Sequence, residues 1–157
     1  TFNMINRSKG FTVIEILIVV AILVITTGII IISLSQINSS QALDKGTSLV
    51  VSVLDEARSL TLSAKDDSQY GVYFQDSGVI LFKGDTYSSF DPENVLTTID
   101  NRLGLRNFSL VGGGSSVVFK RLKGSTNQYG TLEVFLKAST TMMHTINISA
   151  TGVIDVD

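Results

Sequence analysis

KGFTVIEILIVVAILVITTGIIII, residues 9–32, is the stretch that decides how this chain is organised. Between Phe11 and Ile32 the only charged side chain is the carboxylate of Glu15. About 20 consecutive apolar residues are enough for a helix to cross the hydrocarbon core of a bilayer, so the run predicts a membrane-spanning helix. A charge near the centre of such a helix costs about 2.5–3.5 kcal/mol, and less near its end. Glu15 therefore indicates a functional site with a specific partner.

A cut between Gly10 and Phe11 would create that partner. It would leave a free ammonium group, with an ordinary pKa of about 7.7–8.0, on Phe11. Four helical rises separate this residue from Glu15, which is about 6 Å along the axis. Processing would thus supply a counter-charge that the uncut sequence lacks.

These residues resemble the class III signal of type IV pilins and type II secretion pseudopilins, in which a basic leader, Gly10-Phe11-Thr12, Glu15 and a long apolar run follow in this order. The resemblance implies that a prepilin peptidase cleaves after Gly10 and methylates the new N-terminus at Phe11. It also implies that Glu15 helps this subunit to assemble with other pilin or pseudopilin subunits in a hetero-filament. The alternatives are a signal anchor with an accidental Glu15, and a secretory signal peptide, whose apolar core is usually shorter, about 7–15 residues.

The chain is predicted to have four parts. They are the prepilin leader 1–10, the transmembrane or filament-core helix 11–34, an amphipathic continuation of the helix 35–66, and a β-sheet head 67–157. Arg7 and Lys9 precede the apolar run, so the positive-inside bias places the leader in the cytoplasm and the head outside the inner or cytoplasmic membrane. From there we expect the subunit to enter a pilus or pseudopilus. Met4 is a candidate for the true start of the chain.

The apolar pattern changes period after the membrane run. From Gln41 to Ala64, apolar residues recur at spacings of three, four and seven, which predicts an amphipathic helix. After residue 68 the period becomes two, and Asp76-Ser77-Gly78 predicts the turn of a β-hairpin over 71–83. Further strands are expected at 95–99, 108–111, 117–121, 132–138, 145–149 and 153–156. The expected fold is α+β, with a long N-terminal helix packed on an antiparallel β-sandwich head.

The head resembles the H-type minor pseudopilins and the T-type minor pilins, through residues 55–59 on the helix, the hairpin, and the closing segment 146–154. This resemblance implies a minor pilin or pseudopilin, with a major pilin as the main competitor. One departure is the lack of the proline that most pilins carry near the position of Ile32. Our hypothesis is that Gly28, with the two threonines before it, loosens the helix instead, because glycine costs helix stability by about 1 kcal/mol.

The composition gives little support to catalysis, a cofactor or a metal. His144 is the only histidine and cysteine is absent, so a transition-metal site would have no second strong ligand. A nucleophilic triad around this histidine has no recognisable nucleophile elbow. Asp85, Asp91 and Glu93 share a loop and could offer oxygen ligands to calcium, but their spacing is not that of an EF-hand. We expect no enzymatic activity, no cofactor and no metal.

Two other functions remain as alternatives. A DNA-binding minor pilin of a competence apparatus would need a basic surface, because phosphate contacts dominate nucleic-acid affinity. Lys120, Arg121 and Lys123 form only a short cluster, the last residues 155–157 include two aspartates, and the net charge is −2. Nucleic acid is therefore not the expected partner. The second alternative is a membrane-anchored binding domain that does not polymerise.

Overall fold

The computed structural model describes residues 10–157, with the side chains of 29–36 and of residue 140 outside the description. The chain divides into two compact units, Thr1–Asn38 and Ser39–Asp157. The predicted leader lies almost entirely outside the described residues, including Met4, Arg7 and Lys9.

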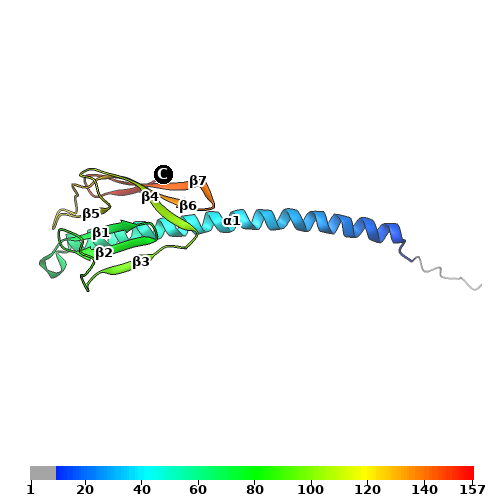
Figure 1. Cartoon of the computed structure of the whole chain (residues 1–157), viewed down its shortest axis with the longest axis horizontal. Coiled ribbons are helices and arrows are strands. Elements are labelled where there is room, and N and C mark those ends of the chain that lie inside the picture. The colour runs from blue at the N-terminus through cyan, green and yellow to red at the C-terminus, as the bar shows by residue number, and fades with distance from the viewer. Residues whose placement is uncertain (1–9) are drawn as a thin grey trace, which may run out of the picture. The chain divides into compact units, whose positions relative to one another are not determined.

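Helix α1 extends from Val13 to Leu62 (Figure 1). It continues through Gly28 without a break, although the sequence suggested local loosening there. The hydroxyls of Thr26 and Thr27 donate to the carbonyl oxygens of Ile22 and Leu23, at 2.9 and 2.6 Å respectively. These threonines therefore satisfy their polar groups within the helix and leave no unpaired hydroxyl on an apolar segment.

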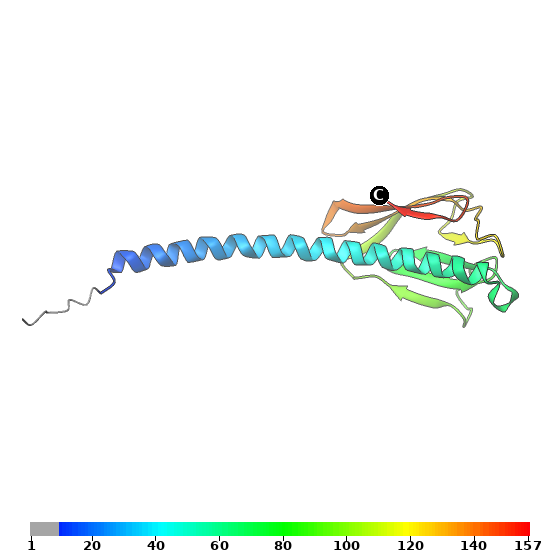
Figure 2. The ribbon, with the colours of Figure 1, turned by 180° about the vertical axis from the view of Figure 1, so that it is seen from behind.

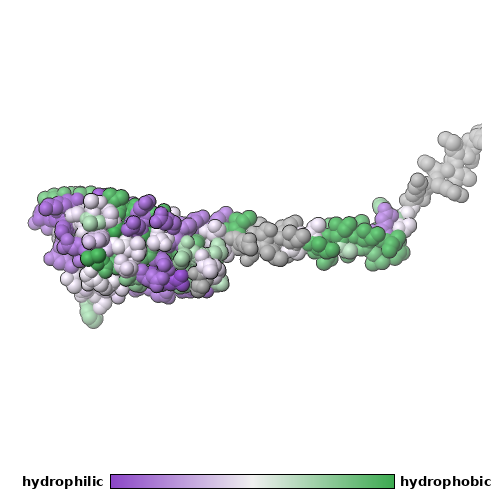
Figure 3. Space-filling model, turned by 90° about the horizontal axis from the view of Figure 1, so that it is seen from above, coloured by the Kyte–Doolittle hydropathy of each residue, from purple (hydrophilic) through white to green (hydrophobic). Residues whose placement is uncertain are grey.

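The described part of the first unit presents an almost wholly apolar helical surface. Figure 3 shows this segment largely in green, with a small purple area near its start. Ile14 and Leu17 are about 60% exposed, at 63% and 60%. Among the described residues, no helix carries an apolar stretch that is long enough to cross a membrane. The predicted membrane segment 11–34 includes residues 29–34, whose side chains lie outside the description.

The described head contains two antiparallel four-stranded sheets (Figure 1). In spatial order, the first consists of β3 (Val95–Thr98), β2 (Gly78–Lys83), β1 (Tyr70–Gln75) and β5 (Ser116–Val118). The second consists of β4 (Leu103–Leu110), β6 (Gly130–Leu136), β7 (Ser139–Ile148) and β8 (Ile154–Val156). The predicted α+β class, with an N-terminal helix on antiparallel sheets, is confirmed.

The predicted hairpin is confirmed: β1 and β2 pair in register from Tyr70↔Lys83 to Gln75↔Gly78 around a two-residue turn. Two strands begin earlier than expected. Strand β4 starts at Leu103, five residues before the predicted 108, and its pairing with β6 shifts between Arg106 and Ser109. This β-bulge interrupts the simple alternation on which the prediction relied. Strand β7 starts at residue 139, six residues before the predicted 145, because polar residues dominate its first half.

The C-terminal part of α1 lies beside both sheets (Figures 1 and 2). Val50, Leu54 and Ala57 are fully buried and belong to one cluster with residues of both sheets, such as Phe74 and Leu132. Their spacing of four and three residues places them on one helix face. After α1, Ala64 adopts a left-handed conformation (φ 49°), and the 3-10 turn η1 (Lys65–Asp67) leads into β1.

Gly46 allows α1 to approach β4 closely. A Cβ atom at this position would lie 2.3 Å from Cδ1 of Leu103, whose side chain is fully buried. By helix propensity alone, a glycine at this position would only destabilise the helix. In the structure, glycine at this position lets α1 and β4 pack closely, although it lowers helix propensity.

Candidate functional site

Thr12 and Glu15 form two hydrogen bonds with each other at the start of α1. The backbone N–H of Glu15 donates to Oγ1 of Thr12 at 3.3 Å, and the backbone N–H of Thr12 donates to Oε2 of Glu15 at 3.5 Å. This reciprocal pair is a capping box, with Thr12 as the N-cap and Glu15 as the third helical residue. The carboxylate also lies in the first turn, where the helix dipole favours negative charge. Helix initiation is thus one local reason for the carboxylate in this apolar run.

Sequence reasoning identified Glu15 but missed its contact with Thr12. The signal was present, because threonine followed three residues later by glutamate, just before an apolar run, is typical of a capping box. The interpretation considered only a counter-charge that processing would create. It therefore overlooked a partner that the uncut chain already contains.

The two predicted processing residues directly precede the helix. Gly10 and Phe11 lie outside α1, in backbone without regular secondary structure. The Phe11 side chain is 79% exposed, and a Cβ added to Gly10 would have no neighbour within 4 Å. The peptide bond between them is therefore accessible in this chain. Together with Thr12 and Glu15, these residues form one continuous segment at the helix start.

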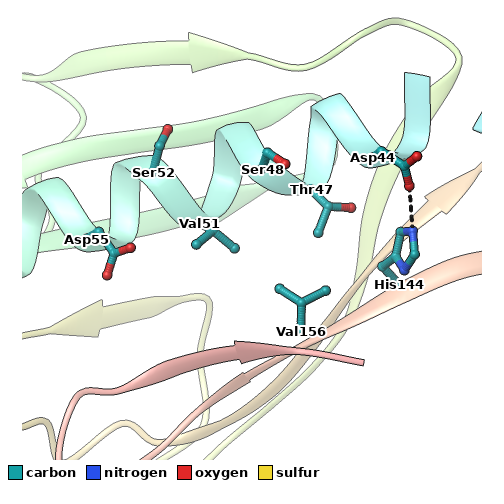
Figure 4. Close-up of a pocket in the computed structure, with 8 residues that line it drawn as sticks. All are labelled: Asp44, Thr47, Ser48, Val51, Ser52, Asp55, His144 and Val156. Atoms are coloured by element: carbon teal, nitrogen blue, oxygen red, sulfur yellow. Dashed lines mark hydrogen bonds and ion pairs between the residues drawn. The ribbon is translucent and has the colours of Figure 1, made fainter. Parts of the chain in front are cut away.

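The head has a groove of about 400 Å³ between α1 and the β7–β8 side of the second sheet (Figure 4). Asp44, Val51 and Asp55 line it from the helix, and His144 of β7 and Val156 of β8 line it from the sheet. The ring Nε2 of His144 lies 3.0 Å from Oδ1 of Asp44. These two residues are 100 positions apart, so local sequence patterns could not predict this contact. The histidine is half-buried and joins the sheet to the helix.

The three loop carboxylates considered for calcium have separate partners. Asp85 accepts a hydrogen bond from Nε2 of Gln69, and Oδ1 of Asp91 accepts one from the backbone N–H of Glu93. The Glu93 side chain lies 3.4 Å from Nζ of Lys83. Within residues 10–157, the described part of the chain, no group of three or more metal-ligating side chains is placed to hold an ion.

Lys83 sits between two carboxylates, at 3.7 Å from Asp66 and 3.4 Å from Glu93. Loss of hydration alone would lower the pKa of Lys83, but the hydrogen bond and attraction to Glu93, with help from Asp66, raise it above its ordinary value. The Tyr70 hydroxyl donates to Oδ2 of Asp66 at 2.9 Å. Burial raises the pKa of Tyr70, and Asp66 raises it further. This network joins η1 to the first hairpin and is structural.

The basic cluster that could bind DNA, Lys120, Arg121 and Lys123, lies in a loop that packs against the rest of the head. Arg121 forms an ion pair with Asp67 of η1, and the backbone N–H of Leu122 donates to the carbonyl oxygen of Thr61 at 3.2 Å. The backbone N–H of Lys120 donates to Ser125 at 2.7 Å. The cluster is thus a compact loop packed on the end of α1, with part of its charge already neutralised.

Comparisons with known proteins agree with this arrangement. Residues 5–31 match the family described as the prokaryotic N-terminal methylation motif, and the match spans Gly10, Phe11 and Glu15. No curated protein matches the sequence significantly. Among solved structures, the type IV minor pilin FimU of Pseudomonas aeruginosa is similar, with a TM-score of 0.57 and 15% sequence identity. The alignment covers 73% of this chain and 92% of that one.

At this identity the likeness to FimU establishes the fold alone, a helix packed on antiparallel sheets as in a type IV minor pilin. The methylation motif provides a separate observation, from sequence and at the other end of the chain. The chain thus combines an N-terminal methylation motif with a type IV pilin-like fold.

Proposed function

We propose that the protein is a minor pilin or pseudopilin, a non-enzymatic structural subunit of a type IV pilus or a type II secretion pseudopilus. The observation that carries this proposal is the combination of an N-terminal methylation motif over residues 5–31 with the fold of a type IV minor pilin. Neither alone would be sufficient, because the motif is short and the fold is shared at low identity.

Processing would take place between Gly10 and Phe11. A prepilin peptidase would cut after Gly10 and methylate the ammonium group of Phe11. The exposure of both residues and their position outside α1 support this role, because a protease needs an accessible, non-helical peptide bond.

Glu15 would then pair with the Phe11 ammonium of its own or a neighbouring subunit. Opposite charges 4 Å apart attract by about 4 kcal/mol at an effective dielectric near 20, before desolvation is subtracted. Much of this gain is lost when both groups leave water. The pair would therefore set the register between subunits more than it would add net stability. The capping box supports this role, because Thr12 holds the carboxylate at the helix start.

Before assembly, the subunit would reside in the inner or cytoplasmic membrane with its leader in the cytoplasm and its head outside. In the filament, the exposed apolar side chains of residues 11–28 would pack against the corresponding segments of other subunits, which removes apolar surface from lipid or water. Partners are thus the prepilin peptidase, the membrane and other pilin-like subunits.

Mass spectrometry of the N-terminus tests this function. In cells with prepilin peptidase, we expect a chain that begins with N-methylated Phe11. In cells without it, we expect the leader to remain. A leader that is intact in both strains contradicts the proposal and favours a membrane-anchored domain that does not polymerise.

A further inference from the structure

One side of the groove described above is an open strand edge. Strand β8 is the last strand of its sheet, and within residues 10–157 no strand pairs with its outer edge. Asp157 and Thr145 exchange two backbone hydrogen bonds, at 3.0 and 2.9 Å. Because antiparallel pairing alternates, the N–H and C=O groups of Ile154 and Val156 point away from β7. The Val156 N–H donates to Oδ1 of Asp155 at 3.0 Å. This edge therefore offers the N–H of Ile154 and the C=O groups of Ile154 and Val156 to a further strand, and the Val156 N–H would have to leave Asp155 to join them.

The other side of the groove is acidic. Asp44 and Asp55 are eleven residues apart on α1, which is about 16 Å along the helix, or about five residues of an extended chain. Among the described residues, Asp55 has no ion-pair partner and the only one of Asp44 is His144. Between the two carboxylates, the half-buried Val51 faces Val156 across the groove (Figure 4). Acidic ends thus flank an apolar centre.

We propose that an extended, basic segment of another subunit occupies this groove and adds to β8 as a further strand. Its backbone would pair with the outer edge of β8 at Ile154 and Val156. Side chains at alternate positions would point toward α1, on the same face of the sheet as Val156. Lysine or arginine would face Asp44 and Asp55, with an aliphatic residue between them. The occupant rests on the proposed function as a filament subunit, whereas the surface lies in the head and peptide binding to it does not depend on processing at Gly10.

Within the described residues, the basic cluster of this chain does not meet these requirements. Lys120 and Lys123 belong to the compact loop described above, where Arg121 pairs with Asp67 and the Leu122 N–H is bound to Thr61. That loop is not available as an extended strand. The chemistry of the groove therefore favours a different polypeptide over a second copy of this one.

Peptide binding to the purified full-length protein in detergent tests the proposal. Three dye-labelled decapeptides serve as probes. The valine–lysine peptide has two lysines four residues apart and a valine midway between them, in a threonine background, so that all three side chains share one face of a strand. The second peptide carries glutamate in place of lysine, and the third is the valine–lysine peptide with every backbone amide N-methylated. We expect fluorescence anisotropy to show binding of the first and at least tenfold weaker binding of the other two. Equal binding of the N-methylated peptide would overturn strand addition, because that peptide cannot donate hydrogen bonds to β8.

A matched pair of variants tests the place of binding. Asp55→Asn is expected to weaken binding of the valine–lysine peptide at least threefold, whereas Glu56→Gln is expected to leave it unchanged. Glu56 is the adjacent exposed carboxylate, and it lines a different hollow of the head. Equal losses in both variants would show a general charge effect and overturn the groove as the site. Circular dichroism of both variants checks that the fold is intact.

Photo-cross-linking in cells identifies the natural occupant. A benzophenone amino acid at Ser52, on the exposed rim of the groove, is expected to attach to an extended basic segment of another subunit. The same probe at position 56 is the control and is expected not to attach to that segment. Attachment from Ser52 to a second copy of this chain, or to a helix, would overturn the proposed occupant.

Discussion

Nε of Arg58 lies 3.2 Å from the carbonyl oxygen of Gly124 and donates a hydrogen bond to it. This contact joins the last part of α1 to the loop between β5 and β6. The same carbonyl oxygen lies beside Gly152, in the turn that connects β7 to β8. Three segments far apart in sequence thus meet at one backbone carbonyl group.

Gly152→Ala is expected to destabilise the head by about 3 kcal/mol, because the new side chain would combine backbone strain with overpacking. Gly152 has a φ of +81°, and its added Cβ would lie 1.8 Å from the Gly124 oxygen. Urea unfolding measures the change. Gly112→Ala is the matched control, because Gly112 also has a positive φ of +89° but has open space around it. Similar losses in both variants would show that strain alone, and not the contact, decides the cost.

Gly46→Ala is expected to destabilise the head by about 1 kcal/mol, since overpacking against Leu103 outweighs the gain in helix propensity of about 1 kcal/mol. In a Leu103→Ala background, the same substitution is expected to stabilise by about 1 kcal/mol, because the clash is gone. A double-mutant cycle from urea unfolding measures the difference. Additive effects of the two substitutions would contradict the close contact between Gly46 and Leu103.

Thr12→Ala and Glu15→Gln are expected to separate the two roles of the helix start. The first removes the N-cap and should lower the stability of the first turn by about 1 kcal/mol, seen as faster amide hydrogen exchange at Glu15. The second keeps a capping-box side chain but removes the charge, so hydrogen exchange should change little while filament assembly falls. Assembly is measured from the amount of the subunit in sheared filaments. Wild-type assembly of Glu15→Gln would contradict the charge-pair role.

Asp100 is expected to titrate far below its usual range. Hydrogen bonds from the Arg102 side chain, at 3.0 and 2.7 Å, and from its backbone N–H lower the pKa of Asp100 from 3.8 to about 2. Because the pKa is lowered on folding, the stabilisation is present above the unfolded value and is lost as pH falls through about 2. Carboxyl NMR should show this midpoint. In Arg102→Ala it should return toward 3.8, and an unchanged midpoint would assign the shift to another cause.

Local patterns in the sequence predicted much of the fold. The apolar spacing at Val50, Leu54 and Ala57 predicted the buried face of α1, and Asp76-Ser77-Gly78 predicted the turn between β1 and β2. The early start of β4 was missed because Asn107 adopts a left-handed conformation within the strand (φ 54°). A bulge of this kind depends on the neighbouring strand, so alternation within one segment does not reveal it.

The candidate sites also differ in how far the sequence alone predicts them. Gly10, Phe11 and Glu15 could be selected from sequence because they lie within six consecutive residues, and the capping box could have been found by the same reading. The groove could not, because its contact between Asp44 and His144 exists only after α1 has packed on the second sheet. Sequence periodicity predicts which face of each element is buried, but not which elements lie side by side.

The position of the N-cap has a consequence for substrate presentation. A helix whose first turn is fixed by Thr12 and Glu15 leaves the peptide bond between Gly10 and Phe11 one residue outside its boundary. Growth of α1 toward the leader would bury this bond in helical hydrogen bonding, and fraying of the first turn would shift it relative to the helix. The capping box thus fixes the start of the helix, so that the proposed scissile bond stays non-helical and at a constant distance from α1. This role would already apply to the uncut chain, before Glu15 contacts a neighbouring subunit.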